Sequence, residues 1–571
     1  VNDSVIYTPI VIDRNHAFTK VDGVLFKQML KMLSLDFICN YDSLILKDTK
    51  KINKLAFALD MAVAGRSDES VWIRQAQEIR KQMTDSLIDS AFTYLPEGVK
   101  HDEIELIKRK LKRRRLELEA VASQYYRLLQ RTPVVAGTNQ SDYFLIERQA
   151  PDRTILRIYD PETGDCRLEQ QFSGRETKEL WLYGLAGNDT FEVKGNTRKD
   201  FPIYLISGEG ENQYQLNHNR KIHVYDKDYK YDYQKIKYHK ISFTPWGIYD
   251  SDKGISLGTF FTYTMYGFKR APFTYQHRIG YNYLKGFMYA GVFPNYDGRR
   301  RLYLNASISS PRNFENFFGF GNNTAGYKEE KKNYNRVKLR TYMLNPSFEM
   351  DLRKEEVVTF FGSLDMYKAK RTDDRYIYTV YGEDHPIFRT NYFVGLGATY
   401  RITKQPYSWL PLLETEWTAG WKMNLKKPER NFPYAQGSLS WNVRFSDRFT
   451  WASLMKGTVL FDNDYEFYQA ATIDLRGFRD NRFIGKQSFY QYSDLRLDMG
   501  KLKNPFTPLK YGLFAGFDYG RVWFPGERSH SWHTSYGGGI WLTFLNKFTT
   551  KYSWFGSTDS FRFAFELGLG F

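Results

Sequence analysis

From about residue 240 to the end of the chain, apolar and polar residues alternate in long segments. In residues 438–445 the sequence SLSWNVRF places four apolar side chains on one face and four polar ones on the other. Successive side chains of a β-strand point to opposite faces of the sheet. This part of the chain is therefore predicted to form long strands with one apolar and one polar side.

The amino-acid composition indicates which kind of β-sheet protein these strands form. Aromatic residues make up 17% of the 571 residues, although the mean hydropathy is only -0.56. A transmembrane β-barrel has this profile, because aromatic girdles surround its wall and polar residues line its interior. The 332 residues from 240 to 571 would supply sixteen antiparallel strands of about 21 residues each, loops included. A large soluble β-sandwich is the alternative.

The charge and the hydropathy pattern exclude other classes. No stretch of the sequence approaches the 18 apolar residues of a transmembrane helix. The chain starts without Met or a leader, so we expect any secretion signal to have been removed or to lie upstream. The net charge of +17 favours anionic surroundings such as lipopolysaccharide or phospholipid headgroups. Nucleic acid is excluded as a partner, because no nucleic-acid-binding motif accompanies the dispersed cations.

The last segment of the sequence, FRFAFELGLGF, predicts a closing barrel strand. Its alternate residues are apolar and share one face, and the last of them is aromatic. A closing strand must pair with the first strand and face lipid to its end. We expect the closure signal to comprise Phe565, Leu567, Leu569 and Phe571.

Two further regions precede the barrel. Residues 1–133 are predicted to be mainly helical and residues 134–239 to form a small β-rich domain. Within the latter, the segments 184–193 and 207–216 resemble the calcium-binding nonapeptide repeat, but only two imperfect copies are present, so a metal-free β-layer is favoured. Cys39 and Cys166 lack the spacing of a disulfide framework or a metal site.

A cationic segment, LRGFRDNRFIG, occupies residues 475–485 of a 26-residue loop, 462–487, which is too long for a passive connection. A later segment, 511–520, is predicted to form a strand. Apolar residues on one of its faces alternate with three glycines, Phe514 and one carboxylate, Asp518, on the other. This alternation turns Asp518 into the barrel interior. An inward carboxylate in a confined space favours a cationic partner.

The order of these motifs resembles the bacterial surface-antigen superfamily, which includes the insertase BamA, the translocation barrel TamA and the two-partner-secretion transporters. The resemblance covers roughly residues 240–571 and includes ENFFGFGNNT at 315–324. It implies that the loop folds back into the barrel. The tip would then comprise Arg476, Gly477 and Phe478, and the acidic partner on the wall would be Asp518.

The resemblance also implies a location and a function. The barrel would lie in the outer membrane of a Gram-negative bacterium, with the N-terminal region in the periplasm, and would assist insertion or translocation of polypeptides. Partners would be outer-membrane lipids and lipopolysaccharide, nascent outer-membrane proteins and assembly lipoproteins. We expect no catalytic residue, metal or other cofactor. A membrane anchor for an upstream phosphoesterase-like enzyme and a simple channel remain as alternatives.

The N-terminal region departs from this family, because no POTRA module is recognisable in residues 1–239. Residues 1–133 resemble instead the tail of a kinase-like module found upstream of barrels fused to a calcineurin-like phosphoesterase. Such modules can hold Mg²⁺ with an Asp-x-Asp pair, but here the pair is Asp13 and Asn15, which argues against a metal. His530 and His533 have no carboxylates close to them in the sequence, so we expect no metal there either.

Overall fold

The structure is a computed structural model of the whole chain, and it divides into two compact units, Val1–Lys237 and Tyr238–Phe571. It describes residues 27, 30, 37–42, 44–95, 101–196, 200–216, 221–226, 231–232, 239–250, 252–268, 270, 272–295, 298–324, 333–372, 374–404, 413–502, 509–544 and 548–569. Asp13, Asn15 and Phe571 lie outside the described residues.

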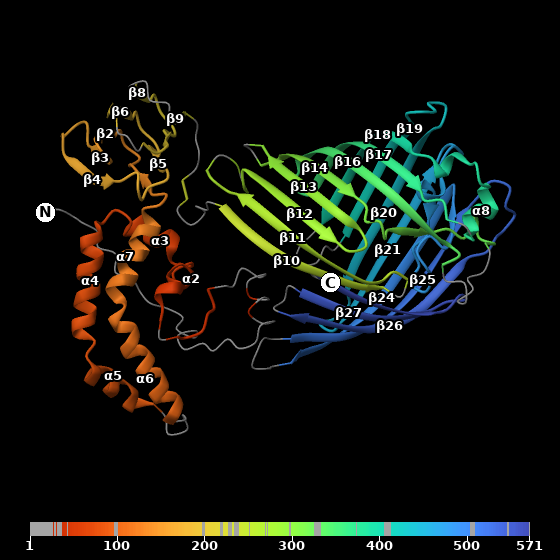
Figure 1. Cartoon of the computed structure of the whole chain (residues 1–571), viewed down its shortest axis with the longest axis horizontal. Helices are drawn as coiled ribbons and strands as arrows, with labels where there is room; N and C mark the ends of the chain where they lie inside the picture. The colour runs from red at the N-terminus through yellow and green to blue at the C-terminus, as the bar shows by residue number, and fades with distance from the viewer. Residues whose placement is uncertain are drawn as a thin grey trace. The chain divides into compact units, whose positions relative to one another are not determined.

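The first unit begins with helices. They are η1 (Leu46–Asp48), α2 (Thr49–Ile52), α3 (Phe57–Val63), α4 (Glu69–Gln82), α5 (Asp85–Ala91), η2 (Phe92–Tyr94), α6 (His101–Leu116) and α7 (Leu118–Leu129) (Figure 1). The basic run of α6 is used inside the unit rather than presented as a bare cationic face. Lys112 pairs with Asp89 at 2.8 Å, and the guanidinium of Arg114 lies 3.8 Å from the ring centre of Tyr41.

Two small sheets follow the helices. Strands β1 (Val134–Ala136), β5 (Leu180–Tyr183), β7 (Ile203–Ile206) and β9 (Ile222–Tyr225) form a parallel sheet. The second sheet has the order β4 (Cys166–Phe172), β3 (Arg153–Tyr159), β2 (Tyr143–Gln149), β6 (Thr190–Gly195) and β8 (Gln213–Leu216). Phe144, Phe191 and Leu205 are fully buried in their shared core. The strands β2, β6 and β8 run parallel, so each turn from one sheet to the other stacks on the next.

Side chains in these stacked turns bond to the backbone of the neighbouring turn. Asp189 Oδ1 accepts a hydrogen bond of 2.9 Å from the amide of Asp142, and Asn212 Oδ1 accepts one of 2.9 Å from the amide of Asp189. The two repeat-like segments of the sequence are therefore two of three such turns, the first of which contains Asp142. These oxygens cap backbone amides of the neighbouring turn.

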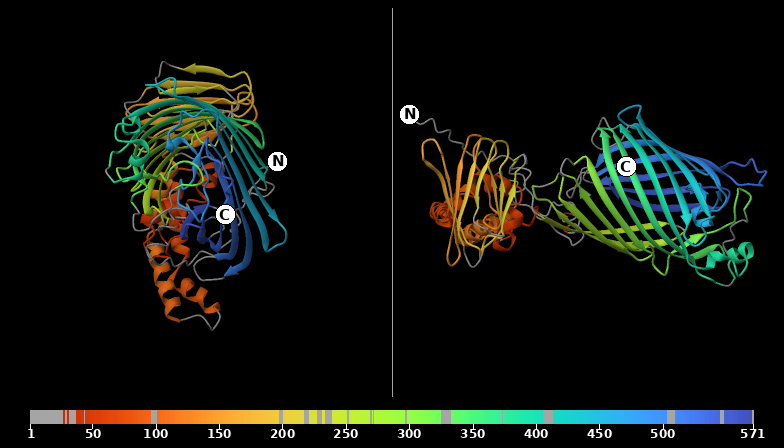
Figure 2. Two further views of the ribbon diagram at one scale, coloured as in Figure 1. Left: turned by 90° about the vertical axis from the view of Figure 1, so that its right-hand side faces the viewer. Right: turned by 90° about the horizontal axis from the view of Figure 1, so that it is seen from above.

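The second unit is an antiparallel β-barrel, as predicted (Figures 1 and 2). In the described residues, sixteen strands follow one another around it: β10 (His239–Asp250), β11 (Gly254–Met265), β12 (Tyr275–Asn282), β13 (Gly286–Pro294), β14 (Arg300–Ile308), β16 (Arg336–Arg353), β17 (Glu356–Ala369), β18 (Asn391–Lys404), β19 (Leu413–Asn424), β20 (Asn431–Arg444), β21 (Phe449–Leu460), β24 (Gln487–Leu502), β25 (Leu509–Trp523), β26 (His533–Phe544), β27 (Phe548–Gly556) and β28 (Phe561–Leu569). The short β15 (Phe314–Asn316) adds to one end of β16.

The outer wall of the barrel is apolar. Leu396, Trp417 and Phe517 point outward with 62%, 60% and 50% of their surface exposed. Along β25 the residues between the exposed ones, from Gly512 to Val522, turn inward, and Asp518 is completely buried. A wall of this kind is typical of a barrel in contact with lipid. No described helix is both long and apolar enough to cross a bilayer.

The barrel has a weak seam between its first and last strands. Among the described residues, only two pairs join β10 to β28, Tyr249 with Phe565 and Asp250 with Ala564. Every other pair of neighbouring strands in the round is joined by at least seven. The two pairs lie at the end of β10 that leads into β11 and in the first half of β28, so the described part of the seam is held toward the end of the barrel that carries the β10–β11 and β27–β28 connections.

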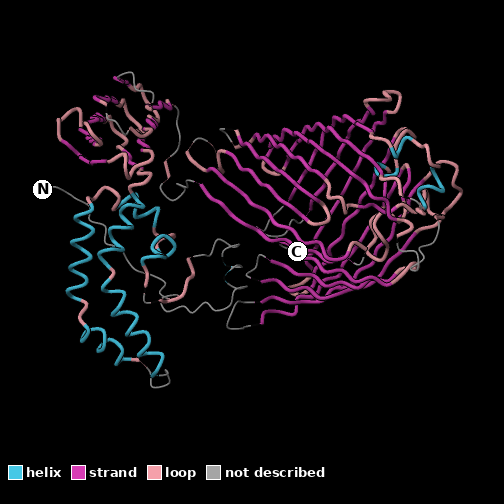
Figure 3. The backbone as a smooth tube through the Cα atoms, in the orientation of Figure 1, coloured by secondary structure: helices cyan, strands magenta, loops and turns pink. Residues whose placement is uncertain are grey.

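The long connections gather at that same end. They comprise residues 309–335, 370–390 with α8 (Tyr376–Tyr381) and η5 (Pro386–Phe388), and 461–486, whereas the other end has shorter ones (Figure 3). Phe317, Ile387 and Phe467, one from each long connection, are buried in one apolar cluster. The loops therefore pack together over this end of the barrel, which is called the loop end below.

The stacked turns predict a pH-dependent stability. Asp189 is fully buried, and its Oδ2 bonds to no described group. Burial raises the pKa of Asp189 to about 7, and the nearby charge of Asp142 adds to the rise. The unfolded carboxyl titrates near pH 4, so between pH 4 and 7 only the unfolded chain releases this proton and stability falls as the pH rises.

We therefore expect Asp189→Asn to stabilise the first unit at pH 8 by roughly 2–4 kcal/mol, since each pH unit between the two pKa values is worth about 1.4 kcal/mol. Asparagine already occupies the equivalent position at Asn212. Pulse proteolysis of the whole protein in urea at pH 5 and pH 8 measures the effect. Asp165→Asn, which removes an exposed carboxyl in the same domain, should change nothing. An equal response of both variants would contradict the burial of Asp189 as the cause.

Candidate functional site

The cationic segment lies inside the barrel. The connection between β21 and β24 contains η6 (Phe467–Gln469) and a two-stranded hairpin of β22 (Ala471–Thr472) and β23 (Ile484–Gly485). The tip of this hairpin spans residues 473–483. Its side chains Ile473, Leu475 and Phe483 are buried against Tyr490 and Val522, which belong to the inner faces of β24 and β25. The loop is thus packed along the inner wall.

Arg476 and Asp518 are in direct contact. The guanidinium Nε of Arg476 donates to both carboxylate oxygens of Asp518 at 3.1 Å, and its Nη2 donates to Oδ1. The backbone amide of Arg476 adds a bond of 3.1 Å to Oδ2. Asp518 is fully buried and also accepts a bond of 2.8 Å from Ser535 Oγ. A forked guanidinium bond fixes orientation as well as distance.

Two glycines make this approach possible. A methyl group on Gly477 would lie 2.6 Å from Ser535 Cβ and 2.9 Å from the carbonyl oxygen of Gly556. One on Gly516 would lie 2.7 Å from Arg476 Nη2. The backbone of Gly477 is not in the left-handed region. Glycine is therefore required at this position on steric grounds, because the loop touches the wall here.

Phe478 packs between the loop and the wall. Its ring lies 5.2 Å from that of Phe483 and 5.9 Å from the imidazole of His533, edge to face in both cases. His533 in turn stacks on Phe483 at 3.5 Å. This histidine, considered as a metal ligand in the sequence, is part of the aromatic packing around the tip, whereas His530 is exposed.

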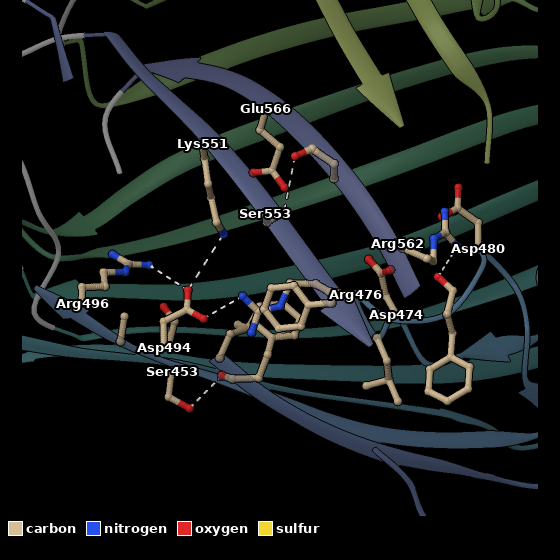
Figure 4. Close-up of a pocket in the computed structure, with 18 of the residues that line it drawn as sticks. Ser453, Asp474, Arg476, Asp480, Asp494, Arg496, Lys551, Ser553, Arg562 and Glu566 are labelled. Atoms are coloured by element: carbon tan, nitrogen blue, oxygen red, sulfur yellow. Dashed lines mark hydrogen bonds and ion pairs between the residues drawn. The ribbon is translucent and has the colours of Figure 1, made fainter. Parts of the chain in front are cut away.

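A second carboxylate, Asp494 on β24, gathers cations from three elements (Figure 4). Arg476 Nη1 donates to its Oδ1 at 2.6 Å, while Arg496 and Lys551 lie 3.8 Å and 3.9 Å from its Oδ2. The guanidinium of Arg476 also lies 3.9 Å from the ring centre of Phe555. Arg476 is therefore shared between Asp494 and Asp518, which sit on adjacent strands.

This cluster borders a cavity of about 420 Å³. Acidic and basic side chains both line it, including Asp474, Arg562 and Glu566. No group of three or more His, Cys, Asp or Glu within the described residues has the geometry of a metal site. The chemistry available here is thus ion pairing and hydrogen bonding within the barrel interior.

The segment 315–324 contacts the loop from the opposite side. Asn316 Nδ2 donates to the carbonyl oxygen of Asp480 at 3.1 Å, and the amide of Gly321 donates to that of Ile484 at 2.8 Å. Asn322 Nδ2 donates to the carbonyl oxygen of Val522 on β25 at 2.8 Å, which ties the same segment to the wall. Phe317 and Phe318 are fully buried. This part of the sequence, noted only as part of a family resemblance, therefore braces the loop that carries Arg476.

Three of the four residues of the expected closure signal, Phe565, Leu567 and Leu569, lie on β28. Phe565 pairs across the seam with Tyr249 and along the sheet with Tyr552. The backbones of Leu567 and Leu569 pair with Thr550 and Phe548, while their side chains and Phe571 are not among the described parts. The role of these residues in closure stays a prediction.

Comparison with known proteins gives distant likenesses. No protein-family model and no curated protein matches the chain. BamA from Haemophilus ducreyi lacking POTRA domains 1–3 is similar over 58% of this chain and 70% of its own, with 12% identity and a TM-score of 0.43. CdiB from Escherichia coli is similar over 62% of this chain and 66% of its own, with 11% identity and a TM-score of 0.38. For CdiB from Acinetobacter baumannii the values are 59%, 66%, 11% and 0.35.

The site predicts that either member of the pair is needed to hold the loop. Arg476→Ala leaves two buried carboxylates without their shared cation, and Asp518→Ala leaves a buried guanidinium short of an acceptor. We expect each change to weaken loop docking by roughly 3–5 kcal/mol, the usual cost of breaking a buried ion pair. Released loops should be cut by trypsin at Arg479 and Arg482 in the purified protein.

Arg476→Lys keeps the charge but loses the forked geometry, so trypsin cleavage should be intermediate. Arg371→Ala provides the control, because Arg371 pairs at 2.9 Å with Glu383 on an exposed part of another loop. If Arg476→Ala and Arg371→Ala were equally resistant to trypsin, Arg476 would not be what holds the loop.

Proposed function

We propose that this chain is an outer-membrane β-barrel that assists insertion or translocation of polypeptides, with its first unit in the periplasm. The proposal assigns Arg476, Gly477, Phe478 and Asp518 to positioning the loop, and no residue to catalysis. Nascent outer-membrane proteins and assembly lipoproteins are the proposed protein partners. Lipopolysaccharide and phospholipid headgroups are the proposed anionic partners of the cationic surface.

The contrast between a filled interior and a weakly paired seam carries the proposal. The loop 461–486 lies along the inner wall, held by Arg476, and the long connections pack over the same end of the barrel. A pore for passive diffusion would need an open path there. The seam offers a different route, because only two pairs of described residues join β10 to β28.

The seam also suggests what the partner is. Over most of their described length, β10 and β28 leave one row of backbone groups without a strand beside them. An unpaired backbone group in hydrocarbon costs several kcal/mol. A strand of another polypeptide would satisfy both rows, as in recognition by strand addition. This argument favours an unfolded β-strand segment as the substrate over a folded protein or a small solute.

Membrane insertion of the barrel has its own test. Phe517 faces outward near the middle of β25, so Phe517→Arg should destabilise the barrel by roughly 2–4 kcal/mol if this site lies near the bilayer midplane. Gln436→Arg on the inner face of β20 is the matched control and should be tolerated. Urea titration in lipid vesicles, followed by heat-modifiable gel mobility, measures both. Solubility without detergent and loss of this mobility would refute the barrel's membrane location.

Depletion in the native bacterium tests the function itself. An assembly role predicts that other outer-membrane proteins decrease on depletion and recover with the wild-type chain but not with Arg476→Ala. Quantitative proteomics of outer membranes measures this. An unchanged membrane composition would contradict the proposal and favour an anchor. Large, steady conductance of the intact protein in planar bilayers would favour a channel instead.

A further inference from the structure

Six consecutive residues of the loop contact both sides of the seam. Gly477 to Arg482 follow Arg476 directly, and all of them except Asn481, whose side chain bonds to Glu315, bond to the first hairpin of the barrel, β10–β11, or to its last, β27–β28. These six residues are called the seam bridge. Nothing in the Arg476–Asp518 pair requires these contacts, because Asp518 lies on β25, away from the two seam strands.

On the first hairpin the seam bridge forms an ion pair with Asp252, which lies in the β10–β11 turn. Arg479 Nη1 forms an ion pair with Asp252 Oδ1, and Asp252 is 1% exposed. Asp480 adds a second pair, its Oδ2 lying 2.8 Å from Lys253 Nζ. Two successive side chains of the bridge are thus bonded to two successive residues of this turn.

On the last hairpin the bridge holds Asp559 and its neighbours. Arg482 Nε donates to Asp559 Oδ2 at 2.5 Å, and Arg482 is 5% exposed. Ser557 Oγ donates to the carbonyl oxygen of Gly477 at 2.7 Å, and Arg562 Nη1 donates to that of Phe478. Side-chain and main-chain bonds therefore fix the β27–β28 turn to the same short segment.

These contacts lie close to the few residue pairs that join β10 and β28 directly. In the described residues the strands meet only at Tyr249–Phe565 and Asp250–Ala564, at the end of β10 and in the first half of β28. Two backbone pairs cannot by themselves fix the edges of a sheet of this size, whereas buried ion pairs with good geometry are directional. We propose that Arg479 and Arg482 are positioning residues that hold the first and last hairpins together through Asp252 and Asp559.

The seam is then closed indirectly. The strands β10 and β28 are both tied to one loop, and the loop is tied to β24 and β25 by Arg476. Undocking the seam bridge would let the two hairpins part without breaking any of the long strand pairings elsewhere in the barrel. The inference concerns closure of the barrel alone and holds whether or not polypeptides are its substrate.

Cross-linking across the seam tests the inference. Tyr249→Cys and Phe565→Cys place thiols at directly paired positions, close enough for a disulfide when the strands are together. Cys39→Ser and Cys166→Ser remove the two native thiols. We expect the double change Arg479→Gln and Arg482→Gln to slow oxidative cross-linking several-fold relative to the intact bridge, with Arg479→Lys and Arg482→Lys closer to wild type.

Arg430→Gln is the matched control, because Arg430 pairs at 2.9 Å with Glu466 of the same loop but lies on the connection between β19 and β20. Heat-modifiable mobility confirms folding, and Asp252→Asn with Asp559→Asn replaces the arginine pair if that variant does not fold. An unchanged cross-linking rate in the folded double variant, or an equal slowing by Arg430→Gln, would overturn the inference. The measurement needs no client protein, so its outcome is separate from that of the depletion test.

Discussion

The arrangement of the barrel interior depends on the ion pairs and hydrogen bonds that the guanidinium of Arg476 forms. This guanidinium is bonded to two carboxylates on adjacent strands and packed against the ring of Phe555. A charge in this position is stable only while all of its partners stay in place. The wall therefore supplies glycine at 516, the loop supplies glycine at 477, and Ser535 completes the bonding of Asp518. Together these contacts decide where the loop lies.

Once the loop is fixed, the rest of the loop end follows. Phe478 packs with Phe483 and His533, and the segment 315–324 braces the other side. The apolar cluster around Phe317 and Phe467 then joins the long connections to one another. The interior of the barrel is thus organised by one hydrogen-bonded cluster and two apolar ones. The seam remains the least paired place in the described wall.

The sequence predicts the barrel well, because a period of two in side-chain polarity has a direct structural meaning. The same parity turns Asp518 inward, and the family resemblance points to Arg476 as the residue beside it. No pattern in the sequence identifies the other carboxylates of the site, which are Asp252, Asp494 and Asp559. Asp252 and Asp559 lie in short turns that are 227 and 77 residues from their arginine partners, and no local pattern encodes a contact at that separation. Only their shared proximity to the RDNR segment, visible in three dimensions, identifies them.

The seam bridge also bears on the order in which the barrel assembles. Closing the sheet directly brings residue 249 to residue 565, and bringing distant segments together costs chain entropy that grows with the length of the intervening loop. The bridge divides that closure into steps. Arg482 can first dock on the nearby β27–β28 turn, after which Arg479 captures Asp252 from the beginning of the barrel. Non-local pairings of this kind are the slow part of folding. If the bridge closes the seam as proposed, the loop serves as a template for ring closure, and the most distant contact in the barrel forms between segments already held side by side.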